Sequence, residues 1–453
     1  MSRMTADEAA TWSGGSWSGA VPVAFASVTT DSRVCSADAL YLALAGEHFD
    51  GHDFVEEALR AGASAAVVKA SYVSDDSTCA LLRVPDTQAA LRDVADGYRR
   101  KVAPRMIGIT GSVGKSTVKE MIAAILGQVS ATAATRGNWN NAIGLPLSLL
   151  AMEPDTEVGV FEVGSNHPGE VADLCGLLRP DWGVVTTIGA SHLEHFGSEE
   201  AVAEEKGALL ASLPSEGVAF LDCDTVFFDV LRHRTAARLV SVGVGRTADY
   251  SCPCEAETSE GVLIEDHRRG ERHTLRLPLP GAHQVHNLLL SVAVAREAGV
   301  SWEAIDAGIA AFKPLPMRWA VQQIRGITMV NDAYNANPTS MQAALATFQE
   351  MPVSGHRWLV LGDMLELGSG SAAAHRALGE RIATGEWAGL VSVGELATAI
   401  ADAAAKGPGH VVRCATAAEA GEWLTSHVAA GDAVLLKGSR SVHLEVIMEI
   451  MVR

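Results

Sequence analysis

A glycine-rich segment at residues 111–117 contains the residue types that bind phosphate groups. Its two glycines let the backbone approach an anion closely, and its backbone N–H groups supply positive potential. Lys115 can reach the terminal phosphates of a nucleotide, and the Ser116 hydroxyl can bind Mg²⁺. The candidate phosphate-binding residues are Gly111, Ser112, Val113, Gly114, Lys115, Ser116 and Thr117.

The segments on both sides of this loop have the patterns of a strand and a helix. An apolar run at 106–110 precedes it, which is typical of a buried strand. Apolar residues then recur at helical spacing at Val118, Met121, Ile122 and Ile125. The common phosphate-loop pattern has a glycine where this chain has Ile109. Because the strand and helix flank the loop correctly, we interpret it as a shorter variant of that pattern.

Polar side chains follow two further predicted strands. Glu162 ends the strand 158–162, where a carboxylate can hold Mg²⁺ beside the phosphates. His192 follows the strand 184–188, and its position fits a Mg²⁺ or substrate role as well as a structural one. Lys206 lies one helix further on and, taken alone, has the pattern of a solvated lysine. The alternation of strands and helices predicts a parallel, doubly wound sheet.

Asparagines are concentrated in the segment that follows the phosphate-loop helix. Asn138, Asn140 and Asn141 lie next to glycines, and their amides can bind a polar ligand. The signal is weak when it is taken as a loop pattern alone. After a polar stretch at 249–276, residues 280–287 open an apolar helix that includes Asn287.

The chain of 453 residues is long enough for about three domains. We expect a small N-terminal α/β domain at 1–103 and a central, doubly wound ATP-binding domain of P-loop type at 104–313. A Pro-rich linker then leads to a C-terminal Rossmann-like α/β domain at 314–453. The polar turns of the N-terminal domain fit a ligand site, although ordinary turns explain them as well. In the C-terminal domain, three predicted strands end in polar loops, which form the ligand crevice in open α/β sheets.

Composition excludes several classes of partner. The net charge is −19 with no block of Lys or Arg, so we expect no nucleic acid or anionic membrane as partner. The chain has no apolar run of about 18 residues, and its start lacks the pattern of a signal peptide. Its seven cysteines are scattered, which fits a reducing cytoplasm.

Four stretches and several single residues together resemble a known family. The phosphate loop is similar to that of the Mur ligases, the ATP-dependent amide-forming enzymes of peptidoglycan precursor synthesis. The stretches 137–147, 162–170, 331–338 and 361–368 resemble the member that joins D-alanyl-D-alanine to UDP-N-acetylmuramoyl-tripeptide. The single residues that fall at the family's nucleotide, metal and phosphate positions are Glu162, His192, Lys206, Asn287, Arg318 and Asp332.

The resemblance implies roles around ATP and two Mg²⁺ ions. Asn287 would contact adenine, Arg318 phosphate and Asp332 ribose. One Mg²⁺ would bind Ser116 and Glu162, and a second would bind His192, with Lys206 as a further ligand if it is carbamylated. The candidate catalytic residues are Lys115, His192, Lys206 and Arg318.

The resemblance also implies where the substrates bind. The UDP end would lie in the N-terminal domain at Ser32, Arg33, Gly46, Asp50 and His52. The muramoyl-peptide portion would contact Asn138, Asn140 and Asn141. The C-terminal domain would deliver D-alanyl-D-alanine, with Tyr334, Asn335 and Asn337 as further substrate residues. We expect a cytoplasmic monomer whose domains close around the reaction.

Two alternatives remain open from the sequence. One is a sister amide ligase, either the ligase that adds the third peptide residue or a folylpolyglutamate-type enzyme. The third-residue ligase usually carries an Asp-Asn-Pro-Arg stretch, whereas this chain has Tyr-Asn-Ala-Asn-Pro at 334–338. The other is a nucleotide-dependent binding protein on the same scaffold, which would have no need of Glu162, His192 and Lys206 together.

Overall fold

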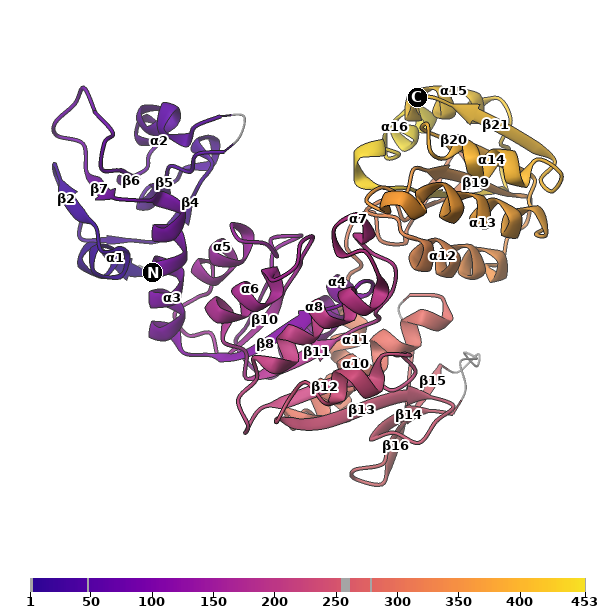
Figure 1. The fold of residues 1–453 in the computed structure, drawn as a ribbon, viewed down its shortest axis with the longest axis horizontal. Helices are drawn as coiled ribbons and strands as arrows, with labels where there is room; N and C mark the ends of the chain where they lie inside the picture. Colours follow the sequence, from indigo (N-terminus) through magenta and orange to yellow (C-terminus); the bar gives the residue numbers. More distant parts are fainter. Residues whose placement is uncertain (1–2, 47–48, 254–260, 278, 453) are drawn as a thin grey trace.

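The computed structural model describes residues 3–46, 49–253, 261–277 and 279–452, and they form three α/β domains in chain order (Figure 1). The N-terminal and C-terminal domains stand on opposite sides of the central one (Figure 1). This agrees with the three-domain α/β class expected from the sequence. Among the described residues, no helix is both long and apolar enough to cross a bilayer.

The N-terminal domain is built on a sheet with the order β2-β7-β6-β5-β4, in which only the edge strand β2 runs antiparallel. Its strands are β1 (Met4–Thr5), β2 (Ser16–Ser18), β3 (Ala24–Phe25), β4 (Ser27–Thr29), β5 (Ala39–Leu42), β6 (Ala65–Lys69) and β7 (Leu81–Val84). Its helices are α1 (Ala6–Ser13), α2 (Val55–Arg60), α3 (Thr87–Val102) and the 3₁₀ turns η1 (Ser32–Val34) and η2 (Gly51–Phe54).

Helix α3 joins this domain to the next. Asp86 caps its first turn, and its apolar face buries Leu91, Val94 and Tyr98. The Tyr98 hydroxyl donates a hydrogen bond to the carbonyl oxygen of Met152, 2.8 Å away in the central domain. The same apolar cluster continues into helices α5 (Gly144–Leu150) and α6 (Glu170–Leu178). The first two domains therefore share a core.

The central sheet has the order β16-β15-β14-β13-β12-β11-β8-β10-β9 among the described residues. Its strands are β8 (Arg105–Thr110), β9 (Thr132–Ala134), β10 (Val158–Glu162), β11 (Trp182–Val185), β12 (Val218–Asp222), β13 (Arg238–Val244), β14 (Tyr250–Cys252), β15 (Val262–Asp266) and β16 (Glu271–Leu275). Its remaining helices are α4 (Lys115–Leu126), α7 (Leu193–Phe196), α8 (Glu199–Ala211), α9 (Phe228–Arg232), α10 (Ala282–Glu297) and α11 (Trp302–Ala311). The chain leaves β8 toward β10 on one side and returns as β11 on the other, so the phosphate loop lies where the strand order reverses.

Two expectations about this sheet were wrong in detail. The sheet is not parallel throughout, because β14, β15 and β16 pair antiparallel at one edge. These strands lie in the stretch 249–276, which the sequence suggested was only polar. Strand β15 alternates buried and exposed residues, so a half-exposed edge strand accounts for the polarity of that stretch. The strand expected at 184–188 begins at Trp182 and ends at Val185.

The C-terminal domain has a sheet of order β17-β18-β22-β19-β20-β21, parallel except for β17. Its strands are β17 (Ala320–Ile324), β18 (Ile327–Asn331), β19 (Arg357–Gly362), β20 (Gly389–Val393), β21 (His410–Cys414) and β22 (Ala433–Lys437). Its helices are α12 (Pro338–Glu350), α13 (Ser371–Ala383), α14 (Thr398–Ala404), α15 (Ala417–Thr425), α16 (Val446–Val452) and the 3₁₀ turns η3 (Gly368–Gly370) and η4 (Arg440–Val442). The ends of β18, β19 and β22 lie side by side, as the polar loops after them predicted.

Helix α11 packs against α4, the helix that follows the phosphate loop. Their contact is close at Gly308, where an added Cβ would lie 2.4 Å from the Cα of Ile125. Backbone atoms cannot move aside as a flexible side chain can. The position of α4, and with it the phosphate loop, depends on a small residue at this site.

We predict that Gly308→Ala lowers the free energy of unfolding by about 1–3 kcal/mol, because the added methyl overpacks the contact between α11 and α4. Urea denaturation of wild type and variant measures this. Gly370→Ala is the matched control, since an added Cβ there meets nothing within 4 Å. Equal stability of both variants would contradict the packing argument.

Candidate functional site

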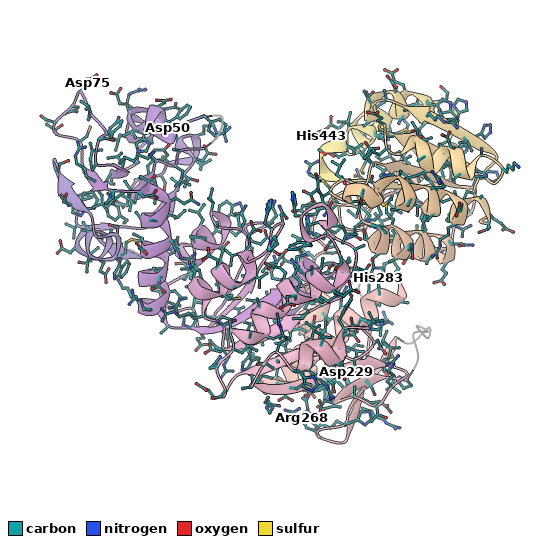
Figure 2. The ribbon with its side chains drawn as sticks, viewed as in Figure 1. Asp50, Asp75, Asp229, Arg268, His283 and His443 are labelled. Atoms are coloured by element: carbon teal, nitrogen blue, oxygen red, sulfur yellow. The ribbon has the colours of Figure 1, made fainter. Side chains whose placement is uncertain are left out.

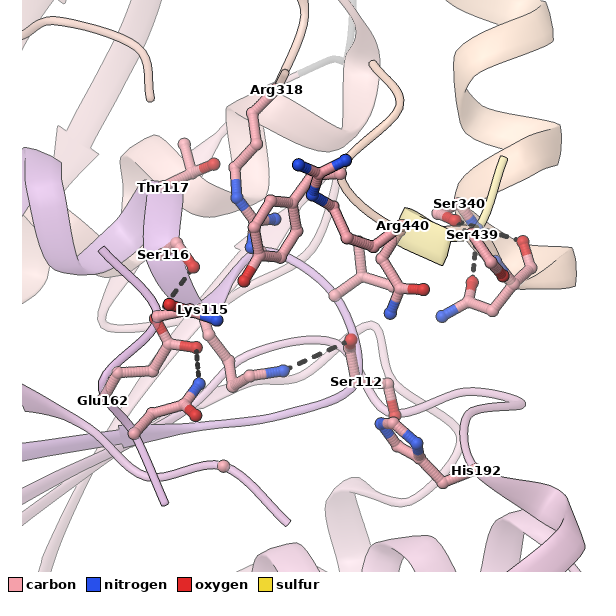
Figure 3. Close-up of a pocket in the computed structure, with 18 of the residues that line it drawn as sticks. Ser112, Lys115, Ser116, Thr117, Glu162, His192, Arg318, Ser340, Ser439 and Arg440 are labelled. Carbon is pink, nitrogen blue, oxygen red and sulfur yellow. Dashed lines mark hydrogen bonds between the residues drawn. The ribbon is translucent and has the colours of Figure 1, made fainter. Parts of the chain in front are cut away.

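A cavity of about 1020 Å³ lies where the central and C-terminal domains meet (Figure 3). The central domain contributes the phosphate loop, the asparagine-rich loop, the end of β10 and the loop that precedes α7. The C-terminal domain contributes the loops after β18, β19 and β22. The cavity thus unites strand-end loops of two sheets, where α/β proteins bind ligands.

The phosphate loop is held in shape by its own contacts. Gly111 and Gly114 have φ angles of 141° and 91°, which other residues rarely adopt. The Lys115 ammonium donates to the carbonyl oxygen of Gly111 at 2.6 Å, and the Thr186 hydroxyl donates to that of Val113, also at 2.6 Å. Burial lowers the pKa of Lys115, and the carboxylate of Glu162 offsets part of this effect. A bound phosphate would add further negative charge next to the Lys115 ammonium.

Glu162 lies at the centre of a hydrogen-bonded group below the loop. The Ser116 hydroxyl donates to one of its carboxylate oxygens at 2.8 Å, and the Asn140 amide donates to the other at 2.7 Å. Its backbone N–H donates to the Thr135 hydroxyl at 2.8 Å. Glu162 is only 1% exposed. A hydroxyl and a carboxylate that meet beside a phosphate loop are the hard oxygen donors that Mg²⁺ prefers.

His192 meets the C-terminal domain across the cavity. Its Nδ1 lies 2.5 Å from a carboxylate oxygen of Glu366. Both residues have left-handed backbones, with φ of 52° and 60°, a conformation that stores strain in non-glycine residues. Burial lowers the pKa of His192, and Glu366 offsets part of that shift. His192 lines the cavity, and nothing in the sequence indicated Glu366 as its partner.

Lys206 is buried rather than solvated, being 1% exposed. Its ammonium donates to the Ser165 hydroxyl at 2.7 Å. Burial, followed by repulsion from Lys115, lowers the pKa of Lys206 to about 7. The solvated lysine that the sequence suggested when taken alone is therefore wrong. An amine in this state reacts with small electrophiles near neutral pH.

The predicted nucleotide residues of the other segments also reach this cavity. The Asn287 amide donates to Gln284 at 2.8 Å, and its oxygen lies so close to the phosphate loop that a Cβ at Gly114 would approach it to 2.4 Å. The Arg318 guanidinium lies 4.1 Å from the centre of the Tyr334 ring. Asp332 forms an ion pair with the buried Lys437 at 2.7 Å.

The predicted asparagines divide into two groups. Asn138 and Asn140 line the cavity, and Asn140 binds Glu162. Asn141 and Asn337 also line it, but their side chains already accept backbone N–H groups at the starts of α5 and α12. Asn335 likewise accepts the N–H of Ala336 at 2.9 Å. Helix-capping asparagines have the same sequence appearance as ligand-binding ones.

The five predicted residues of the N-terminal domain lie away from this cavity. Figure 2 places Asp50 in the N-terminal domain and His443, which lines the cavity, across from it in the C-terminal domain. Asp50 accepts from the His52 backbone at 3.0 Å, and His52 accepts the N–H of Lys69 at 2.9 Å. Ser32, Arg33 and Gly46 lie in the loops after β4 and β5, at the carboxyl edge of the sheet.

Sequence reasoning missed several cavity residues. They are Ser165, His283, Gln284, Glu366, Lys437 and Arg440. Glu366 and Arg440 lie in strand-end loops that the sequence already marked as polar, so their position carried a signal. For His283, burial lowers the pKa to about 4, which favours a neutral imidazole beside the Gln284 amide.

We predict that Gly114→Ala weakens ATP binding roughly tenfold to a hundredfold, because its methyl displaces Asn287 from the loop. Gly169→Ala is the matched control, since its φ is also 91° but nothing lies within 4 Å of its Cβ. Calorimetric titration with ATP measures the affinity of both variants. Similar losses in the two variants would show that backbone strain alone is responsible.

Three family models match the chain, one in each domain. The Mur ligase family, catalytic domain, matches residues 24–99, and the Mur ligase middle domain matches 109–295. The Mur ligase, glutamate ligase domain, matches residues 317–440. These matches follow the order of the three sheets.

Individual proteins are similar over nearly the whole chain. The UDP-N-acetylmuramoyl-tripeptide–D-alanyl-D-alanine ligase of Bacillus subtilis is 35% identical over 93% of this chain and 92% of its own. A crystal structure of MurF from Acinetobacter baumannii has a TM-score of 0.87 at 31% identity, covering 99% of both chains. The MurF ligase of Thermotoga maritima, solved in complex with ADP, has a TM-score of 0.78 at 28% identity over 94% of this chain and 96% of its own.

Proposed function

The chain belongs to the Mur ligase family, and we propose that it joins D-alanyl-D-alanine to UDP-N-acetylmuramoyl-tripeptide at the expense of ATP. It is an ATP-dependent, amide-bond-forming ligase of peptidoglycan precursor synthesis. One observation carries the proposal. The phosphate loop, Glu162 and His192 of one domain face the strand-end loops of the next across a single cavity, and the buried Lys206 is hydrogen-bonded to Ser165 of its lining.

The chemistry requires activation of a carboxylate. A peptide carboxylate is a poor electrophile, so one of its oxygens first attacks the γ-phosphorus of ATP, forming an acyl phosphate and ADP. The dipeptide amine then attacks the carbonyl carbon, and phosphate leaves with the carboxylate oxygen. Both steps build negative charge on oxygen, which Lys115 and Arg318 stabilise from fixed positions.

Ser116 and Glu162 would hold Mg²⁺, because their oxygens already converge at 2.8 Å. When bound, the ion neutralises charge on the transferred phosphoryl group. Asn140 fixes the second oxygen of Glu162, so that the carboxylate stays in place when the Ser116 hydroxyl turns toward an ion. His192 contributes to a second ion, facing the same cavity from the loop before α7.

Lys206 fits a metal site only after it is carbamylated, since an ammonium group cannot ligate a cation. Its neutral amine would add to CO₂ and release a proton, leaving a carboxylate on the side chain. Three features support this proposal: Lys206 is buried, its hydrogen bonds go to Ser165, and its pKa is about 7.

Each of the three domains binds a different substrate or part of one. We assign domain boundaries at 1–103, 104–313 and 314–453, and the three family models fall within these ranges. The UDP end binds in the N-terminal domain, at Ser32, Arg33, Gly46, Asp50 and His52.

The muramoyl peptide lies along Asn138, Asn140 and Asn141. Asn287 contacts adenine and Asp332 ribose, while Tyr334 serves the incoming dipeptide and Asn335 and Asn337 shape the loop before α12. We propose that the protein works as a cytoplasmic monomer.

We predict that Lys115→Ala lowers dipeptide-dependent ADP release at saturating substrates by roughly a hundredfold or more, because the transferred phosphate loses its charged donor. A coupled ADP-release assay with UDP-N-acetylmuramoyl-tripeptide and D-alanyl-D-alanine measures this. Lys406→Ala, an exposed lysine of the C-terminal domain, is the control and should turn over normally. Near-normal turnover of Lys115→Ala would refute the assignment of the phosphate loop.

We also predict a carbamate on Lys206 that forms more readily as pH rises. With a pKa of about 7, the amine is mostly protonated at pH 6 and mostly neutral at pH 8, and only the neutral form adds to CO₂. ¹³C NMR with labelled bicarbonate should therefore show a carbamate signal that grows from pH 6 to pH 8. Lys206→Gln should lack it, and a signal that persists in this variant would assign the carbamate elsewhere.

A further inference from the structure

Two charged side chains on the C-terminal wall of the cavity have no role in the account above. Glu366 follows β19 and Arg440 follows β22, and both line the cavity (Figure 3 labels Arg440). Their side chains are 43% and 50% exposed, respectively. The neighbouring Lys437 differs, because it is buried and neutralised by Asp332.

The loops that carry these two charges are fastened to each other. The backbone N–H of Leu365 donates to the Ser439 hydroxyl at 3.0 Å, and the N–H of Ser439 donates to the Asp363 carbonyl oxygen at 2.9 Å. The buried His375 accepts the N–H of Met364 at 3.0 Å. Residues adjacent to both charges are therefore held in one platform.

Glu366 points its carboxylate toward the reaction centre. It contacts His192, and the loop that holds His192 contacts the phosphate loop through the hydroxyls of Ser191 and Ser112, 2.9 Å apart. The left-handed backbone of Glu366, with φ of 60°, costs energy that an ordinary loop position would avoid. This backbone conformation places the Glu366 carboxylate at the phosphoryl end of the cavity.

Within the described part of the chain, Arg440 forms its ion pair with a carboxylate from its own loop. Its guanidinium lies 2.5 Å from Glu445, whose other carboxylate oxygen is buried without a hydrogen-bond partner. A planar guanidinium pairs best with a carboxylate that uses both oxygens. Arg440 is thus a half-exposed cation suited to a carboxylate ligand. The anionic Glu366 lies on the neighbouring loop of the same platform.

We propose that Glu366 and Arg440 are the two poles of a subsite for a zwitterionic dipeptide. Glu366 binds the ammonium group, and Arg440 binds the terminal carboxylate. This inference rests on the proposed function and names the residues that select its second substrate. The polarity suits the reaction, because the amine that attacks the acyl phosphate is held at the end nearest the phosphate loop.

The carboxylate pole is tested by comparing D-alanyl-D-alanine with D-alanyl-D-alaninamide, which lacks the terminal charge. Wild type should prefer the acid by roughly tenfold to a hundredfold in kcat/KM, the size expected for a hydrogen-bonded charge. Arg440→Ala should lose that preference while its kcat/KM for the amide changes little. Arg413→Ala, an arginine on the edge strand β21, should retain the preference. A preference that survives in Arg440→Ala overturns the assignment.

The ammonium pole is tested with propionyl-D-alanine, which lacks the amino group and inhibits by competing with the dipeptide. Glu366→Gln should raise the KM for D-alanyl-D-alanine roughly tenfold or more and leave the inhibition constant of propionyl-D-alanine unchanged. Glu380→Gln, an exposed acid of α13, is the control. If both constants rise together in Glu366→Gln, Glu366 acts through the shape of the site and the proposal fails.

These outcomes are distinct from failure of the proposed function. Wild type without ADP release that depends on D-alanyl-D-alanine would refute the proposed reaction itself. If wild type is active and the Arg440→Ala and Glu366→Gln variants discriminate between the paired ligands as wild type does, only the two-pole subsite is refuted. Unchanged calorimetric affinity for ADP in both variants shows that the central domain is intact.

Discussion

The hydrogen bond between Ser116 and Glu162 is the contact on which the rest of the site depends. It joins the first turn of α4 to the end of β10, so the phosphate loop and the metal-binding acid keep one geometry. The second oxygen of Glu162 holds Asn140, and its backbone holds Thr135, which fixes both ends of the asparagine-rich loop. A buried carboxylate needs hydrogen-bond donors to both of its oxygens, and Ser116 and Asn140 supply them. Three segments distant in sequence are thus positioned by one acidic side chain.

Both outer domains share apolar packing with the central domain. The N-terminal domain does so through α3, and another apolar cluster runs from the central domain into the C-terminal domain. At the cavity itself, the C-terminal domain meets the central one through polar contacts, among them the pair of His192 and Glu366. Polar contacts can exchange for substrate contacts at small net cost. Rearrangement around bound substrates is therefore expected on the polar side of the cavity.

Much of the site was readable from the sequence because α/β sheets place ligands at strand ends. Lys115, Glu162 and His192 each follow a predicted strand, and all three line the cavity. What failed depended on contacts between distant segments. The burial of Lys206 and its bond to Ser165 leave no trace in local periodicity. The asparagines show the opposite difficulty, since a ligand-binding amide and a helix cap, such as Asn337, have the same local pattern.

Whether the chain transfers the phosphoryl group of ATP to a substrate carboxylate is the central claim, and one isotope measurement tests it directly. UDP-N-acetylmuramoyl-tripeptide with both oxygens of its terminal carboxylate labelled with ¹⁸O is incubated with ATP, Mg²⁺ and D-alanyl-D-alanine, and product and phosphate are weighed by mass spectrometry. An acyl phosphate requires that each molecule of phosphate released carries one ¹⁸O and that the new amide keeps the other. Amide product accompanied by unlabelled phosphate would contradict the mechanism derived from this site.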